Sequence, residues 1–357
     1  MQKNNIFFIL YFFFLSVVHG QENTIPIGKF DDNIRDKNTI RVCFYNAENL
    51  FDPENDSLKN DDDFTPEGNY HYSYSKFHKK VNNIAQVIVA MGGWEAPEIV
   101  GLCEIENNNV LKKLIYSEAL KKYKYRFVHY ESEDSRGIDV ALIYRYEKFK
   151  VINSMPIPII DSTNLFFKTR DILYVQGTLP DKLTDTLHIF VNHWPSRYGG
   201  YSQTIEKRNL AAKTLRSKID SILIINEKAA IIVIGDFNDY PYDESISKYL
   251  NAVSNPKKIT DNQLLNTMYP YLSMNNVGSH KYQANWGILD QIIVSKPMIT
   301  NKEGWTIKST AVIFNADFLL IPDDTHMGVK PFRTYIGMRY QGGFSDHLPI
   351  FIDLICK

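Results

Sequence analysis

The sequence predicts a single α/β domain behind a short N-terminal targeting segment. Short apolar runs typical of strands alternate along the chain with amphipathic stretches at helical spacing. No repeat, low-complexity linker or shift of composition marks a place to divide the chain. With 44% hydrophobic and 23% charged residues, the 357 residues can form one sizeable core.

The first 20 residues have the layout of a secretory signal peptide. Lys3 precedes an apolar run from Ile6 to Val18, and a small residue, Gly20, precedes the predicted cleavage point. The run is shorter than the ~20 residues that a membrane-spanning helix needs, which favours cleavage over retention as an anchor. We therefore expect a signal peptide at 1–20, an exposed lead-in at 21–38 and one domain at 39–357. The predicted location is periplasmic or secreted.

The order of expected elements follows from the periodicity. Apolar residues recur every three or four positions in three stretches, and helices are expected at 75–91, 110–120 and 203–226. The run IIVI at 231–234 is apolar throughout, as in a strand that is buried on both faces. Strands are expected there and at 40–45, 98–102, 138–144, 172–178, 188–192, 289–295 and 349–354.

Two features between these elements give weaker signals. The irregular stretch 52–72 is rich in aspartate, but its spacing does not match an EF-hand, which favours a solvated acidic loop. The three cysteines give no disulfide framework. Cys43 and Cys103 lie in apolar runs and are interpreted as buried small side chains, with one disulfide left as the alternative.

The charge balance excludes one class of function. A net charge of -1 and a pI near 6.8 lack the basic footprint of a protein dedicated to holding nucleic acid. An enzyme that must release a cleaved polyanion is not excluded, because a bound metal ion supplies local positive charge.

Polar side chains follow the carboxyl ends of several predicted strands, where sites form in layered α/β proteins. Carboxylate and amide oxygens are the ligands that Mg²⁺ or Mn²⁺ prefers. No HExxH motif or cysteine cluster indicates a dedicated zinc site. The residues at these strand ends are Asn46, Glu104, His193, Asp236, Asn238, Asp346 and His347.

Six segments, in order, resemble motifs of the endonuclease/exonuclease/phosphatase superfamily. They are NAENLF at 46–51, LCE at 102–104, NHWPSR at 192–197, GDFN at 235–238, LDQIIVS at 289–295 and SDHLP at 345–349. Any one would be weak, but six in order extend over nearly the whole mature chain. The resemblance implies a DNase I-like, four-layered α/β sandwich with two central mixed β-sheets.

The resemblance also implies roles for individual residues. Glu104 would be the principal metal ligand, and the metal shell would be completed or oriented by Asn46, Asp346 and Glu48. Mg²⁺ is the expected cofactor, with Mn²⁺ or Ca²⁺ as alternatives.

The catalytic groups follow from the same motifs. Asp236 would align or deprotonate the attacking water, and Asn238 would bind the scissile phosphate. His347, held by Asp290, would stabilise the charged transition state. Each imidazole is expected beside a carboxylate that raises its pKa, which pairs His193 with Asp139.

Three arginines are expected to contact substrate phosphate: Arg170, Arg136 and Arg197. For Arg136 and Arg197 a plain surface position is the alternative. Trp194 would either stack on a base or sugar, or pack beneath the site.

The predicted function is an exported, metal-dependent nuclease that cleaves DNA or RNA by in-line attack of water. The alternatives are an exported phosphatase or phospholipase-C-like esterase for inositol phosphate or sphingomyelin, and a non-catalytic binding protein on the same fold. The Trp-Cys-Asp-Arg pattern of inositol phosphatases is absent, and the expected catalytic groups are present. We expect a monomer with nucleic acid as its substrate, no stable protein partner and no membrane span after signal cleavage.

Overall fold

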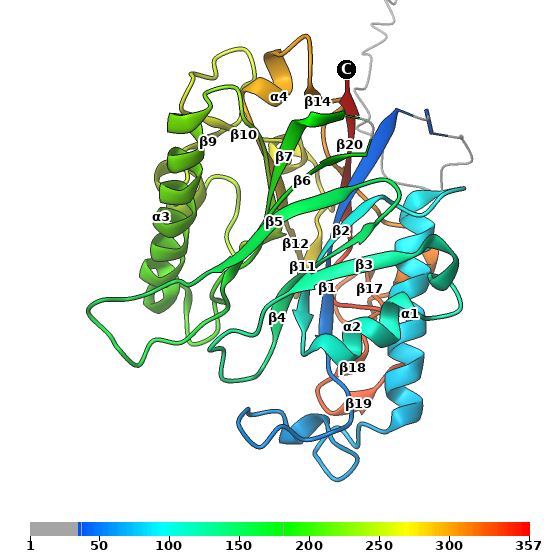
Figure 1. Ribbon diagram of the computed structural model, residues 1–357. Coiled ribbons are helices and arrows are strands. Elements are labelled where there is room, and N and C mark those ends of the chain that lie inside the picture. The colour runs from blue at the N-terminus through cyan, green and yellow to red at the C-terminus, as the bar shows by residue number, and fades with distance from the viewer. Residues whose placement is uncertain (1–34, 37, 181) are drawn as a thin grey trace, which may run out of the picture.

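The computed structural model describes residues 35–36, 38–180 and 182–357 (Figure 1). The predicted signal peptide and most of the lead-in lie outside the described residues. At the end of the lead-in, Arg35 is only partly exposed and forms an ion pair of 3.1 Å with Glu98. The domain boundaries at 39 and 357 stay predictions. Nowhere in the described ranges is a helix long and apolar enough to cross a membrane.

One mixed sheet has β1 and β2 at its centre. Its order is β14–β20–β1–β2–β4–β3, and β15 pairs with β20 as well. β1 and β2 run parallel, whereas the other neighbours are antiparallel. The strands are β14 (Trp305–Ile307), β15 (Val312–Ile313), β20 (Ile350–Cys356), β1 (Thr39–Leu50), β2 (Ile99–Ile105), β4 (Asp139–Arg145) and β3 (Tyr125–His129).

The second mixed sheet has β7 and β8 at its centre, and these two strands run parallel. Its order is β5–β6–β7–β8–β13–β10–β9. The strands are β5 (Lys150–Ile157), β6 (Ile172–Leu179), β7 (Lys182–His193), β8 (Ala230–Asp236), β13 (Asp290–Ser295), β10 (Leu264–Asn266) and β9 (Ala252–Val253).

Helices cover the outer faces of the two sheets (Figure 1). α1 (Tyr74–Gly92) and α2 (Asn108–Ile115) lie on the side of the first sheet, and α3 (Tyr201–Ile225) lies on the side of the second. The short α4 (Pro297–Thr300) leads into β14. The predicted four-layered sandwich with two mixed sheets is confirmed.

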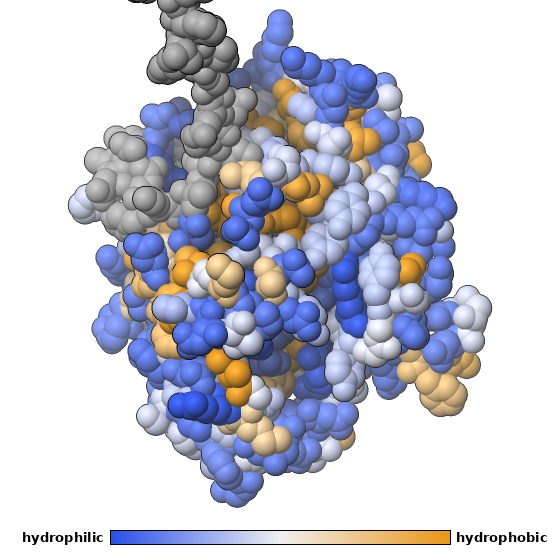
Figure 2. All heavy atoms as spheres, turned by 180° about the vertical axis from the view of Figure 1, so that it is seen from behind, coloured by the Kyte–Doolittle hydropathy of each residue, from blue (hydrophilic) through white to orange (hydrophobic). Residues whose placement is uncertain are grey.

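The fully apolar run at 231–234 follows from this layering. Ile232 and Ile234 face the core between the sheets, and Ile231 and Val233 join the apolar cluster that includes α3. Alternate residues of one strand are thus buried in two different layers. The face opposite that of Figure 1 is mainly hydrophilic, with small separate hydrophobic patches (Figure 2).

The two sheets approach closely at Gly101 of β2. A Cβ atom at this position would lie 2.6 Å from Cδ1 of Ile234 and 3.2 Å from Cγ1 of Val191. Those two side chains belong to β8 and β7 of the other sheet. Glycine is therefore required by the close approach of the second sheet rather than by a turn.

The structure differs from the sequence prediction in the loops. Within 52–72, Asp52 and Asp61 are buried rather than solvated, and a 3₁₀ turn forms at Asp62–Phe64. Phe64 stacks on Phe51 at 4.3 Å between ring centroids, so the loop has its own apolar anchor. The strands β3 and β5 were not predicted, because exposed polar residues interrupt their alternation. All three cysteines are buried and none forms a disulfide, so the disulfide alternative is wrong.

His188, at the outer face of β7, predicts a measurable pH dependence of stability. Its Nδ1 lies 2.7 Å from the Tyr174 hydroxyl, and burial lowers its pKa from 6.5 to about 4. As the pH falls, the unfolded chain binds a proton at this histidine before the folded protein does. The contribution of His188 to the free energy of unfolding is therefore present above pH 6.5 and is lost as the pH falls towards 4. Relative to His188→Gln, the wild-type protein should lose about 2–3 kcal/mol between pH 7.5 and 4.5 in urea unfolding.

The control for this measurement is His78→Gln on the exposed face of α1, which should follow the wild-type curve. Parallel stability curves for wild type and His188→Gln would show that His188 does not titrate as described.

Candidate active site

The polar strand ends meet at one edge of the sandwich. β1, β2, β7 and β8 all end there, as the parallel pairs β1–β2 and β7–β8 require. β13 runs antiparallel to β8 and begins at this edge, with Asp290 as the register partner of Asp236. The segment before β20 adds Asp346 and His347. The site is thus assembled from both sheets.

Irregular backbone turns the ligand side chains of the first sheet into the site. The β1–β2 register shifts after Asn46, and the β2–β4 register shifts around Glu104. Glu48, Asn49 and Glu104 adopt positive φ angles of 51°, 52° and 60°. Such bulges re-aim side chains and carry backbone strain that is common at functional sites.

These bulges bring Asn46 and Glu104 together. The Asn46 Nδ2 lies 3.4 Å from Glu104 Oε1 and 3.1 Å from Asp236 Oδ2. The backbone N–H of Asn49 donates to Glu104 Oε2 at 2.8 Å. One amide therefore links the acid of the first sheet to the acid of the second.

Two cations neutralise the remaining acids of the first sheet. Arg333 donates to Glu48 Oε1 at 3.0 Å and to Asp346 Oδ2 at 2.9 Å. The buried Lys80 lies 3.4 Å from Glu48 Oε2. Burial and then Asp346 raise the pKa of Glu48, against the opposing charges of Lys80 and Arg333. Burial alone would raise the pKa of Asp346, but Arg333 and His347 hold it at about 2.

This donor set fits a divalent cation. Its members are carboxylates and one amide, which are hard oxygen donors suited to Mg²⁺ or Mn²⁺. The residues that would hold it are Glu104 and Asp346, with Asn46 and Glu48 beside them. Among the described residues, some groups of His, Asp and Glu side chains have ligand atoms within 4.8 Å of one another. Asp346 belongs to such a group, with His280 and His347, whereas Glu104 belongs to none.

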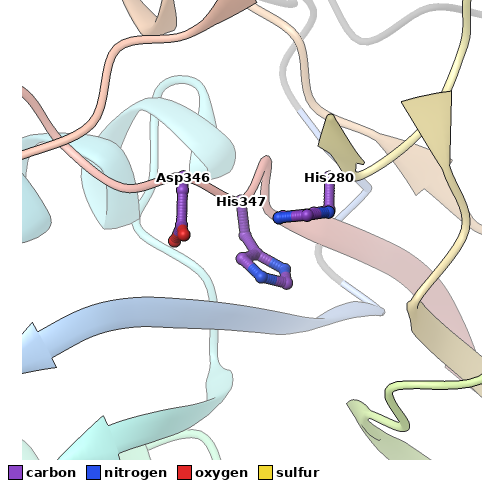
Figure 3. Close-up of side chains that lie close together, drawn as sticks. All are labelled: His280, Asp346 and His347. Atoms are coloured by element: carbon purple, nitrogen blue, oxygen red, sulfur yellow. The ribbon is translucent and has the colours of Figure 1, made fainter. Parts of the chain in front are cut away.

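His347 lies between carboxylates and a second imidazole. Its Nδ1 donates to Asp290 Oδ2 at 2.7 Å, and its Nε2 lies 3.7 Å from Asp236 Oδ2. Burial alone would lower the pKa of His347, but Asp290 and Asp236 hold it well above its ordinary value. His280 of β11 (His280–Tyr282) lies on its other side, with 4.6 Å between ring centroids (Figure 3). Burial lowers the pKa of His280 to about 4, which leaves it neutral at pH 7.

Asp236 is held in place by the segment that follows β8. Its Oδ1 accepts the backbone N–H of Asn238 at 2.9 Å, and Asn238 adopts a positive φ of 52° that asparagine tolerates. Burial raises the pKa of Asp236 to about 6, and His347 opposes this shift. Asn238 Nδ2 donates to the Trp194 carbonyl at 3.0 Å, so in this state it is engaged by the protein rather than free for phosphate.

The predicted Asp139–His193 pair does not form. His193 Nε2 lies 3.8 Å from both Glu104 and Asp236, while its buried Nδ1 has no hydrogen-bond partner within the described chain. Burial, with Arg170 as the next cause, lowers the pKa of His193 well below its ordinary value, so it is neutral rather than protonated. Asp139 begins β4 and lies 3.9 Å from His129 Nε2 instead.

The three arginines predicted to contact phosphate lie in different surroundings. Arg170 is buried, and its guanidinium pairs with Asp134 at 3.0 Å and donates to the His193 and Trp194 carbonyls. Arg197 pairs with Asp243 at 2.7 Å and Asp239 at 3.1 Å.

The remaining placements concern Arg136 and Trp194. Arg136 is exposed, 3.8 Å from Asp134, and its charge is among the causes that lower the pKa of His193. Trp194 is fully buried and packs edge-on against Phe237, at 4.7 Å between ring centroids, so it packs beneath the site and does not stack on a base.

Sequence reasoning missed Lys80, His280 and Arg333. Lys80 carried a signal, because it falls three residues after Phe77 and four before Ile84 on the apolar face of α1. A charged residue on such a face needs a buried partner. His280 begins the three-residue strand β11, and Arg333 lies in the loop after β17 (Val329–Pro331). Both segments are too short to show periodicity, so no pattern placed them near the site.

The comparison with protein families decides the membership of the chain. The model of the Endonuclease/Exonuclease/phosphatase family matches residues 41–356. The chain belongs to this family. Family and fold together support a metal-dependent phosphodiesterase- or nuclease-type function for this member of the Endonuclease/Exonuclease/phosphatase family.

Solved structures of low sequence identity share the fold. A humanized D. rerio TDP2 with 14 mutations is 14% identical, with a TM-score of 0.54, and the match covers 89% of this chain and 99% of that one. A family protein from Bacteroides thetaiotaomicron is 15% identical at a TM-score of 0.54, covering 89% and 98%. D. rerio TDP2 complexed with single strand DNA product is 15% identical at a TM-score of 0.51, covering 88% and 98%. No curated protein matches the sequence.

Proposed function

We propose that this protein is an exported nuclease that hydrolyses phosphodiester bonds of DNA or RNA with Mg²⁺ as its metal. The observation that carries the proposal is the group formed by His347, Asp290 and Asp236, with Asn46 linking Asp236 to Glu104. It places a charged imidazole, a buried carboxylate and a cluster of metal-ligating oxygens at one edge of the fold. These are the groups that hydrolysis of an anionic ester requires.

Each residue has a task that follows from its contacts. Asp236 lies 3.7 Å from the His347 Nε2 and is fixed by Asn238, so it aligns a water molecule and accepts its proton. The Nδ1–H of His347 donates a hydrogen bond to Asp290, which orients the ring. The Nε2–H on the other side of the ring stabilises the negative charge that develops on the reacting phosphate. A divalent cation held by Glu104 and Asp346 would add charge neutralisation at the phosphate and leaving oxygen.

A cavity beside the site supports nucleic acid over a small phosphate ester. It has a volume of about 250 Å³, and Glu48 and Arg333 line it on the side of the metal-ligating acids. The hydroxyl of Tyr72 is buried without a hydrogen-bond partner in the described part of the chain. Its aromatic lining residues are Phe64, Tyr70, Tyr72 and Tyr335, of which Phe64 and Tyr70 are partly exposed. Partly exposed aromatic rings stack nucleobases without strong sequence preference.

Two further points support the proposal. The layout of residues 1–20 supports export. The D. rerio TDP2 of the same fold was solved with a single strand DNA product, which supports a nucleic acid substrate.

The test is a panel of substrates assayed with protein from which metal has been removed by a chelator. Plasmid DNA, single-stranded RNA, inositol polyphosphate and sphingomyelin are each incubated with EDTA, Mg²⁺, Mn²⁺ or Ca²⁺. We expect cleavage of DNA or RNA that EDTA abolishes and Mg²⁺ restores, and that Glu104→Ala lacks. The matched control is Glu118→Ala, an exposed acid after α2, which should cleave like the wild type.

Other outcomes reassign the protein. Turnover of inositol polyphosphate or sphingomyelin without nucleic acid cleavage would keep the site and move the protein to the phosphatase or phospholipase-C-like class. Inactivity on every substrate, with the protein folded and metal-loaded, would favour a binding protein on the same fold.

A further inference from the structure

A second group of metal-ligating side chains lies on the β3–β4 hairpin, outside the site described above. His129 ends β3, Asp139 begins β4, and Glu131 lies in the loop between them. The antiparallel register pairs His129 with Ala141, which brings the two strand ends together. His129 Nε2 lies 3.9 Å from Asp139 Oδ2, and Nδ1 lies 3.9 Å from Glu131 Oε1. One ligand atom from each residue comes within 4.8 Å of the other two.

Three polar atoms of this group, from His129 and Asp139, are buried but unpaired. The side chain of His129 is 0% exposed, and neither of its ring nitrogens has a hydrogen-bond partner among the described residues. Asp139 Oδ2 is likewise buried and unpaired. Buried polar atoms without partners are rare and cost about 1–3 kcal/mol each, so three in one place require an explanation.

The distances exclude direct hydrogen bonds between the imidazole of His129 and the two carboxylates. At 3.9 Å, both imidazole–carboxylate separations exceed hydrogen-bond length. They fit a cation placed between nitrogen and oxygen at about 2.0–2.2 Å from each. Burial lowers the pKa of His129 to about 4, so the ring is neutral at pH 7 and keeps the lone pair that a metal needs. The carboxyl of Glu131 is 54% exposed, which opens the group to solvent.

We propose that His129, Glu131 and Asp139 form a second cation site, which takes a borderline transition-metal ion such as Zn²⁺. One imidazole and two carboxylates suit Zn²⁺, Mn²⁺ or Co²⁺, in contrast to the all-oxygen donors around Glu104. The exposed side of Glu131 leaves room for a water ligand. This inference does not rest on the proposed nuclease function.

The site would fix the loop that supports the catalytic edge. Lys59 donates to the carbonyls of Ser132 and Asp134 at 2.9 and 3.0 Å, and the Asp134 carboxylate pairs with Arg170. Arg170 in turn donates to the backbone carbonyl of His193. A cation at the start and end of this loop therefore acts as a structural clip, one ion pair away from the residue that contacts His193.

The test counts bound Zn²⁺ in the full chain. Apo protein prepared with a chelator is titrated with Zn²⁺ by calorimetry, and bound metal is measured by elemental analysis after dialysis. To remove binding at the first site, the titration is repeated in the Glu104→Ala, Asp346→Ala double variant. We expect one equivalent of Zn²⁺ to remain in the double variant.

Glu131→Gln added to the double variant should weaken this remaining binding at least about 10-fold. Because Glu131 is largely exposed, the melting temperature of the apo protein should not change. The matched control is Glu133→Gln, an equally charged and 78% exposed residue of the same loop, which should bind Zn²⁺ as before. X-ray absorption of the bound Zn²⁺ should show a single imidazole.

Two results would overturn the inference. The first is a double variant that binds no Zn²⁺ although its circular dichroism is that of the wild type. The second is a loss of affinity that is equal in Glu131→Gln and Glu133→Gln. Should the double variant fail to fold, the single Glu131→Gln change in the otherwise unaltered chain should lower the bound Zn²⁺ by one equivalent, and an unchanged count would refute the site.

Discussion

Replacing His347 by alanine should slow phosphodiester cleavage by about 10³-fold. The Nδ1 of His347 is fixed on Asp290 at 2.7 Å, and Nε2 faces Asp236 at 3.7 Å. The substitution removes the charged donor at the point where negative charge develops, so kcat should fall far more than KM rises. The measurement is steady-state kinetics on one defined oligonucleotide with saturating Mg²⁺.

Two further variants make this result specific. His78→Ala, the same change at an exposed histidine of α1, should retain the wild-type rate. Asp290→Asn keeps the size of the partner but removes its charge, and it should also lower kcat, with the optimum shifted to lower pH. A His347→Ala enzyme within tenfold of the wild-type kcat would remove His347 from the chemistry.

Replacing Arg170 by methionine should lower the free energy of unfolding by about 3–5 kcal/mol. The Arg170 side chain is only 5% exposed and pairs with the buried Asp134 at 3.0 Å. It also donates to the Trp194 carbonyl at 2.8 Å. The change leaves the buried Asp134 carboxylate without its charged partner, which is costlier than the loss of packing, whereas Asn238 still donates to the Trp194 carbonyl. Urea unfolding at pH 7 measures the difference.

The controls separate this structural role from contact with substrate. Arg136→Met, at an arginine side chain that is 45% exposed, should change the free energy by no more than about 0.5 kcal/mol. Adding Asp134→Leu to Arg170→Met should restore part of the loss, because the unpaired charge disappears. A stable Arg170→Met protein with a raised KM would instead favour the phosphate contact that the sequence predicted.

The backbone positions of the site could be predicted from the sequence, because strand ends are local features. Asp236 follows an apolar run, Asp290 begins another and His347 lies just before the last. The order of the six motifs then defined the family and, through it, the two-sheet sandwich. No comparable pattern marks β3 or β5, whose exposed residues interrupt the alternation.

Side-chain partners could not be predicted in the same way. The direction of the Glu104 side chain depends on a bulge with a positive φ angle, and no residue type in the sequence indicates this bulge. Asp139 was assigned to His193 from a motif, but its neighbours are set by the β3–β4 register, which directs it towards His129. Arg333 is 285 residues from Glu48 in sequence, and only the folded chain brings the two together.

Because the two sheets approach closely at Gly101, the rate of catalysis should depend on the spacing between them. Asn46 belongs to one sheet and Asp236 to the other, so their contact of 3.1 Å holds only at one separation of the sheets. Any side chain at Gly101 would press on Ile234, two residues before Asp236, and act as a wedge. The rate of turnover should then fall as the spacing between the sheets increases, well before the protein loses its fold.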